Sequence, residues 1–190
     1  MHKMNMGKIS FLCCWVGGTS LSVYLSTYLY VSFRSLDFVY VLATAAIVAL
    51  VQSIILYRKI DNALLYFIAT VIGTNLCISI SLFGSFALFV LFFFPPVIAI
   101  ACCLGGLSLG LFQRFVFKTL RRSNLILIAD VVAMTLALPH TILVLWTLND
   151  TYSTASHTIT WVSAITVSSV IASTIQGITI SYLLGYGKRQ

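Results

Sequence analysis

The sequence has few charged residues of either sign, and it lacks glutamate altogether. Only 8% of its 190 residues are charged, whereas a soluble domain carries about 25%. The acids are four aspartates, Asp37, Asp61, Asp130 and Asp150. So few charges cannot cover a water-facing surface, which excludes an ordinary soluble domain and predicts a single all-α domain over 1–190 that is solvated by lipid.

Motifs that carry chemistry are also missing. The sequence has no glycine-rich phosphate loop, no HExxH or GxSxG motif, and no cluster of acids suited to magnesium. Its five cysteines form no CxxC pair and lie in apolar stretches, as small apolar filler does. We therefore expect neither an enzyme nor a protein that holds a cofactor or metal.

Apolar segments fill most of the chain, and each crossing of a bilayer needs about 20 such residues. Residues 62–113 contain no charged side chain, which is too long a stretch for one crossing and enough for two. The pattern predicts a six-helix transmembrane bundle. Its helices are expected at about 9–33, 38–57, 64–84, 95–117, 124–148 and 157–184.

The turn between the third and fourth helices has two candidate positions. Gly84-Ser85 and Pro95-Pro96 are each typical of a helix end. Proline is tolerated in the first turn of a helix, because its missing N–H would be unpaired there anyway. This favours a fourth helix that begins near Pro95, although both positions stay open.

Basic residues indicate the orientation. With six crossings and an inner N-terminus, Arg34 is the one basic residue on the outer side among the 11 Lys and Arg residues. This is the bias of the positive-inside rule, so both termini are predicted to be cytoplasmic, and we expect a bacterial plasma membrane. The net charge of +7 then reflects topology and lipid contact, and we expect no nucleic-acid partner.

A repeated pattern occurs in the second, fourth and sixth predicted helices, where two small residues four apart precede a glutamine. The three copies are Ala45-Ala49-Gln52, Gly106-Gly110-Gln113 and Ser169-Ser173-Gln176. Their spacing is close to the length of one helical hairpin, which suggests three tandem hairpins. Small residues four apart let two helix backbones approach closely, and glutamine can donate across to a neighbour. The pattern predicts either a packing seam or three glutamines around a central polar site.

Asp130 is the one acid expected inside a helix. Such a residue is costly in a membrane and normally faces a partner in the protein interior. Arg114, Lys118 or Arg121 could pair with it at the inner rim. Alternatively, Asp130 couples to a proton or a cation. Asn75 and His140 are further polar residues within predicted helices and complete the candidate binding or packing residues.

Two functions follow from these features. The first is a non-enzymatic accessory, anchoring or assembly subunit whose small-residue strips pack against another membrane protein or a second copy of the chain. The second is a small-solute binding or transport protein with a central polar site of Gln52, Gln113, Gln176 and Asp130. Whether the glutamines are used up in helix–helix hydrogen bonds distinguishes the two.

Overall fold

The computed structural model consists of six helices, with no strand in the part of the chain that it describes. The helices are α1 (Met6–Phe33), α2 (Asp37–Leu56), α3 (Ala63–Phe92), α4 (Pro96–Val116), α5 (Asn124–Leu148) and α6 (Ala155–Gly187). The structure describes residues 6–33, 37–92, 96–118, 120, 122–148 and 155–187. Side chains are described for 7–28, 42–87, 98–118, 120, 122–139 and 162–185.

The turn between α3 and α4 lies at the second of its two candidate positions. Helix α3 continues through Gly84 and Ser85 to Phe92, so the expected end at residue 84 is about two turns too early. Gly84 serves helix packing, because a Cβ there would lie 3.3 Å from the Cβ of Ala101 in α4. Helix α4 begins at Pro96, where proline fits the first turn.

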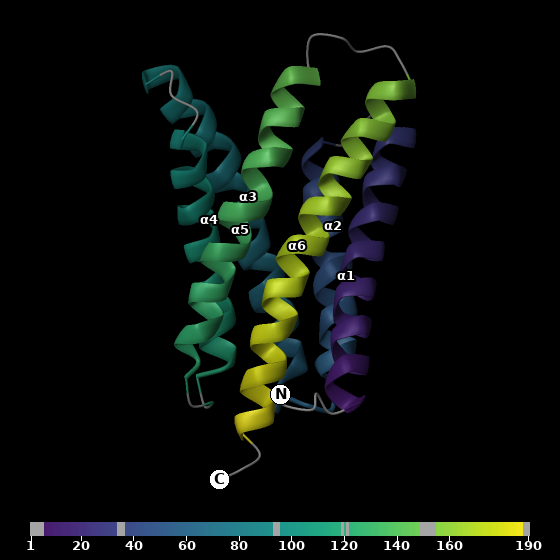
Figure 1. Ribbon diagram of the computed structural model, residues 1–190, viewed down its shortest axis with the longest axis vertical. Coiled ribbons are helices and arrows are strands. Elements are labelled where there is room, and N and C mark those ends of the chain that lie inside the picture. Colours follow the sequence, from purple (N-terminus) through teal and green to yellow (C-terminus); the bar gives the residue numbers. More distant parts are fainter. Residues whose placement is uncertain are drawn as a thin grey trace.

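The six helices form a closed ring. Each helix packs against its neighbours in the sequence, and α1 also packs against α6. Successive helices run in opposite directions, so the first turn of α1 and the last turn of α6 lie at the same end (Figure 1). This end, at the bottom of Figure 1, is called the terminal end below.

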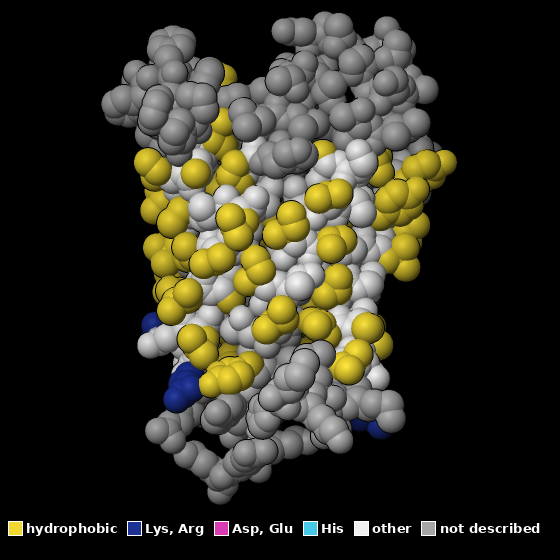
Figure 2. Space-filling view, viewed as in Figure 1, with side chains coloured by type: hydrophobic (Ala, Val, Ile, Leu, Met, Phe, Trp, Pro, Cys, Tyr) yellow, Lys and Arg dark blue, Asp and Glu magenta, His cyan; other side chains and the backbone are white. Residues whose placement is uncertain are grey.

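The surface and the interior of the ring have reversed polarity compared with a soluble protein. Large apolar side chains such as Leu21, Ile54 and Leu136 are exposed, and apolar side chains cover the middle of the face in Figure 2. Buried positions, in contrast, include Gln52, Gln113 and many serines and threonines. A lipid environment explains this distribution, because apolar side chains such as leucine are stable in contact with lipid and polar side chains such as glutamine are not.

Within the residues whose side chains are described, four helices are long and apolar enough to cross a membrane. The stretches are Gly7–Tyr28, Ala63–Ala87, Ile98–Val116 and Val162–Gly185. The apolar stretches within the described side chains of α2 and α5 are shorter, at Leu42–Leu56 and Asn124–Pro139.

Candidate functional site

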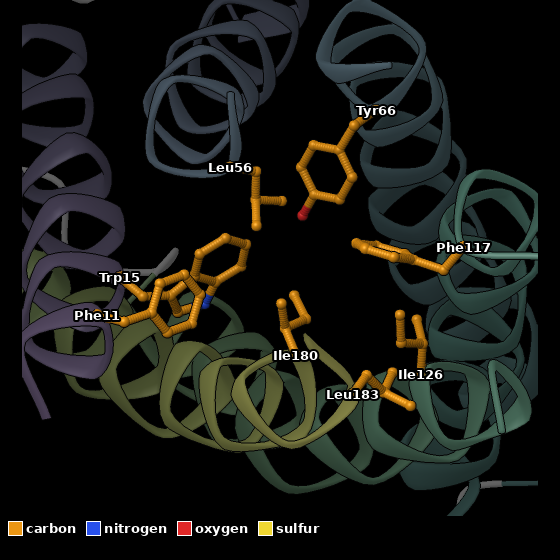
Figure 3. Packing of buried hydrophobic residues seen from close by; sticks show 8 residues of the cluster. All are labelled: Phe11, Trp15, Leu56, Tyr66, Phe117, Ile126, Ile180 and Leu183. Atoms are coloured by element: carbon orange, nitrogen blue, oxygen red, sulfur yellow. The ribbon is translucent and has the colours of Figure 1, made fainter. Parts of the chain in front are cut away.

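A cluster of large side chains fills the ring near its terminal end; they come from five of the helices and from Phe117, which directly follows α4. Figure 3 shows these side chains pointing from the surrounding helices toward a shared centre. The cluster, called the inner plug below, consists of Phe11, Trp15, Leu56, Tyr66, Phe117, Ile126, Ile180 and Leu183. Three of its rings are in edge contact, with centroids 6.4 Å apart for Trp15–Tyr66 and 5.7 Å apart for Tyr66–Phe117. The inner plug thus closes this end of the ring with apolar groups.

Polar residues lie one helical turn from the inner plug on each of the six helices, on the side away from the terminal end. Each polar residue is four positions from a plug residue, which corresponds to a rise of about 6 Å. The pairs are Trp15/Thr19, Leu56/Gln52, Tyr66/Thr70, Phe117/Gln113, Ile126/Asp130 and Ile180/Gln176. We call Thr19, Gln52, Thr70, Gln113, Asp130 and Gln176 the polar layer, and all six are buried.

Gln52 is held by hydrogen bonds on both of its amide atoms. Its Nε2 donates to the Thr19 hydroxyl of α1 at 3.2 Å, and its Oε1 accepts from the Tyr66 hydroxyl of α3 at 3.0 Å. Gln52 therefore joins three helices, and its hydrogen bonds are used in helix–helix contacts.

Asp130 is bonded to Gln176, which lies on the neighbouring helix α6. Gln176 Nε2 donates to Asp130 Oδ1 at 2.5 Å. The second carboxyl oxygen, Oδ2, is buried and has no hydrogen-bond partner within the described residues. The expected ion pair with a basic residue is not formed by Arg114 or Lys118, since both are exposed and Lys118 lies over the Phe115 ring. Arg121 lies outside the described residues.

Gln113 differs from the other two glutamines, because its Oε1 is buried without a hydrogen-bond partner in the described part of the chain. The Trp15 indole Nε1 is likewise buried and without a partner there. Two unpaired acceptors, on Asp130 and Gln113, one unpaired hydroxyl, on Thr70, and one unpaired donor, on Trp15, therefore belong to the polar layer and the adjoining face of the plug. Unpaired buried polar atoms are rare in folded proteins and require an explanation.

The small-residue strip of α4 packs against the backbone of α5. A Cβ on Gly106 would lie 2.7 Å from the Asp130 carbonyl oxygen and 2.8 Å from Val131 Cα. A Cβ on Gly110 would lie 2.8 Å from Leu127 Cα and 3.4 Å from Asp130 Cβ. Only glycine allows this approach, so the strip serves to bring α4 against the helix that carries Asp130.

The corresponding strips of α2 and α6 also face the bundle interior. Ala45 and Ala49 of α2 and Ser173 of α6 are buried, and Ser169 is half-buried with its hydroxyl bonded to a carbonyl of its own helix. Five of the six strip residues predicted from the sequence are thus buried within this chain, and Ser169 is half-buried.

The two remaining candidates do not join the polar layer by any described contact. Asn75 is half-buried, and its Nδ2 donates to the Val71 carbonyl one turn earlier in α3. The backbone of His140 belongs to α5, but its side chain lies outside the described ones. Over the described residues, no group of three His, Cys, Asp or Glu side chains is placed to hold a metal ion.

Reasoning from the sequence missed Thr70, Tyr66 and Trp15. A signal for them is present, because on the odd-numbered helices a large residue precedes a polar one by four positions, at Trp15/Thr19, Tyr66/Thr70 and Ile126/Asp130. The buried positions of α3 recur in α5 sixty residues later. They are Tyr66, Ala69, Thr70, Gly73 and Cys77 in α3, and Ile126, Ala129, Asp130, Ala133 and Ala137 in α5. Asp130 therefore occupies the position that Thr70 has in α3.

Comparison with known proteins gives no match: no family model, curated protein or solved structure is similar to this chain. The function must therefore be argued from the polar layer itself.

Proposed function

We propose that this chain is an integral membrane protein that crosses the bilayer six times and binds a small polar solute inside the helical ring for transport. The ring consists of three tandem hairpins, α1–α2, α3–α4 and α5–α6, each of which contributes two residues to the polar layer. The solute occupies the polar layer, the inner plug forms its floor, and no covalent chemistry takes place.

The placement of basic side chains supports the membrane orientation. Lys8, Lys59, Arg114, Lys118 and Arg122 lie at or near the terminal end of their helices, and Figure 2 shows dark blue side chains near this end. By the positive-inside rule this end is cytoplasmic, so the inner plug closes the ring toward the cytoplasm.

The observation that carries the proposal is the buried Asp130 Oδ2, which has no partner among the described residues. Asp130 is 0% exposed and lies one turn from Ile126, whose side chain points to the middle of the ring in Figure 3. A polar group that is buried without a partner costs free energy, and a bound solute that bonds to it removes this cost. Binding sites in membrane transporters occur among such intramembrane polar residues.

The alternative function, an accessory subunit that docks another membrane protein, loses its main support. Its argument was that the small-residue strips offer a docking face, and Gly106 and Gly110 are already in close contact with α5. The hydrogen bonds of Gln52 do follow the pattern expected for a packing role, whereas the unpaired atoms of Gln113 and Asp130 do not.

The test is purification of the full chain in mild detergent, with mass spectrometry of both proteins and small molecules that remain bound. We expect a retained small molecule, or a rise in unfolding temperature with a member of a solute panel. The variant Gln113→Leu is expected to abolish this binding. Leu111→Ala, at an exposed position two residues away on α4, should bind as the parent chain does.

Two results would overturn the proposal. One is a stoichiometric protein partner with no bound or stabilising solute, which would establish the accessory function instead. The other is solute binding that survives in Gln113→Leu while both variants remain folded, because the site would then lie outside the polar layer.

A further inference from the structure

The charge inside the ring determines what kind of solute fits. Asp130 is the one acid that lies within a helix among the residues whose side chains are described. Its carboxyl group is bonded to the neutral amide of Gln176. Within the described residues no Lys, Arg or His lies in hydrogen-bond contact with it. An ionised carboxylate in a membrane interior needs a positive counter-charge, and this part of the chain does not supply one.

Unpaired oxygens of the polar layer lie on three successive helices: the hydroxyl of Thr70 on α3, and two acceptors on α4 and α5. Asp130 Oδ2 belongs to α5, and Gln113 Oε1 belongs to α4. The helices approach closely here, since the Cβ position of Gly110 is 3.4 Å from Asp130 Cβ, and Gln113 follows Gly110 by less than one turn on the same face. Two acceptors at one helix seam suit a solute that donates hydrogen bonds.

Aromatic rings form much of the floor beneath this seam. Trp15, Tyr66 and Phe117 belong to the inner plug, one turn below the polar layer. Tyr66 stands at 63° to Trp15 and at 71° to Phe117, so at most a part of this floor turns a ring face toward the polar layer, where it would attract an organic ammonium group. Anionic solutes are disfavoured, because they would meet an acid and no basic side chain in the described polar layer.

We infer that the polar layer selects a solute with one positive charge and N–H donors, an alkylammonium ion, whose nitrogen lies between Asp130 and Gln113. The inference rests on the proposed function and narrows it to a class of solute. A bare metal cation needs several oxygen ligands, so equal stabilisation by sodium chloride in the experiment below would overturn the inference.

The experiment compares a charged probe with a neutral one of the same size. The full-length chain, in lipid nanodiscs, is heated with ethylammonium chloride, with ethanol, or with sodium chloride at the same ionic strength. We expect only ethylammonium to raise the unfolding temperature in a saturable manner. Asp130→Asn keeps the shape and removes the charge, so the apparent affinity for ethylammonium should fall roughly tenfold or more.

Asp130→Thr is the second variant, because threonine occupies the matching positions 19 and 70 and is therefore compatible with this packing. It should fold, as judged by its elution as a single species, and it should also lose the ethylammonium response. Leu111→Ala is the control and should respond as the parent chain does.

The outcomes separate this inference from the proposed function. If ethanol stabilises the chain as well as ethylammonium does, or if a folded Asp130 variant keeps the full response, the charge selectivity is refuted and a neutral-solute site remains. If neither probe has an effect while a neutral solute binds in a Gln113-dependent manner, the inference fails and the proposed function stands. If no solute of any class binds, both fail.

Discussion

A glutamine side chain has an oxygen that accepts hydrogen bonds and a nitrogen that donates them, and the glutamines of the polar layer use these atoms differently. Gln52 uses both atoms, Gln176 donates to a carboxylate, and Gln113 leaves its oxygen unpaired in the described structure. Buried polar groups that are paired stabilise a fold, whereas unpaired ones reduce its stability. Residues at matching positions should therefore respond differently to the same substitution.

Gln52→Leu is expected to lower the free energy of unfolding by about 1–3 kcal/mol, because it removes the hydrogen-bond partner of the buried Tyr66 hydroxyl. Gln113→Leu, tested without solute, should leave the free energy of unfolding unchanged or raise it, since it removes an unpaired oxygen. Unfolding titrations in mixed micelles would measure both values. An equal loss in the two variants would mean that Gln113 is bonded within the bundle.

Individual polar residues could be identified from the sequence more readily than their partners. The spacing of the three glutamines and the isolation of Asp130 in an apolar helix were visible without a structure. The partner of Asp130 was not, because Gln176 is 46 residues away and a basic residue near the same helix end was the simpler expectation. Charge attraction suggested Arg114 as the partner. Arg114 is exposed, however, and Asp130 is buried, so the two side chains do not pair.

Among the helix pairs, α4 and α5 show most directly how small residues position the site. The contacts at Gly106 and Gly110 are with backbone atoms of α5, which cannot move aside as a flexible side chain can. The distance between these helices therefore sets the distance between Asp130 and the face of α4 that carries Gln113.

Gly106→Ala and Gly110→Ala are each expected to lower stability by about 1–3 kcal/mol, since the added methyl group forces α4 away from α5. Gly17→Ala is the control, because a Cβ at Gly17 meets nothing within 4 Å and alanine favours helix. Its stability should be unchanged or higher. Thermal unfolding of the three variants would test this, and a loss at Gly17 equal to that at Gly106 would contradict it.

Helix ends were harder to predict than helix centres. Gly84-Ser85 has the composition of a turn, yet it lies within α3 and packs beside Ala101. Glycine weakens a helix in water, but in a membrane helix it is also a packing residue, and local composition does not distinguish these two uses. The start of α4 at Pro96 was predicted to within one residue, because proline has a specific physical role at that position.

For the whole molecule, closure of the ring depends on the contact between α1 and α6. A Cβ on Gly177 of α6 would lie 2.7 Å from Trp15 Cδ1 and 2.9 Å from Leu12 Cδ1, both on α1. The first and last helices therefore meet at a tight contact that also fixes the Trp15 indole. This pairing could not be read from the sequence, which indicates the neighbours within a hairpin and leaves the order of the hairpins around the ring open.

Gly177→Val should separate α1 from α6 and lower the free energy of unfolding by about 1–3 kcal/mol. Ile178→Val, at the exposed neighbouring position, serves as the control and should change it little. Unfolding titrations of the two variants would measure the difference. Equal stability would argue against a closed ring.

The proposed topology is tested by labelling single cysteines in a chain whose five native cysteines are replaced. Lys59→Cys lies in the exposed connection between α2 and α3, and a membrane-impermeant maleimide should reach it only after the cells are opened. Arg34→Cys, which the sequence places on the outer side, should be labelled in intact cells. The reverse pattern would invert the orientation.

Positions 19, 70 and 130 have matching depths in the ring, and they hold threonine, threonine and aspartate. The architecture therefore does not dictate which hairpin carries the acid. A chain with Thr70→Asp and Asp130→Thr would keep the same helices and glycines while its negative charge moved one third of the way around the axis. Two substitutions are then enough to move the negative charge to another hairpin, so the place of the charge around the axis can change while the packing glycines stay the same.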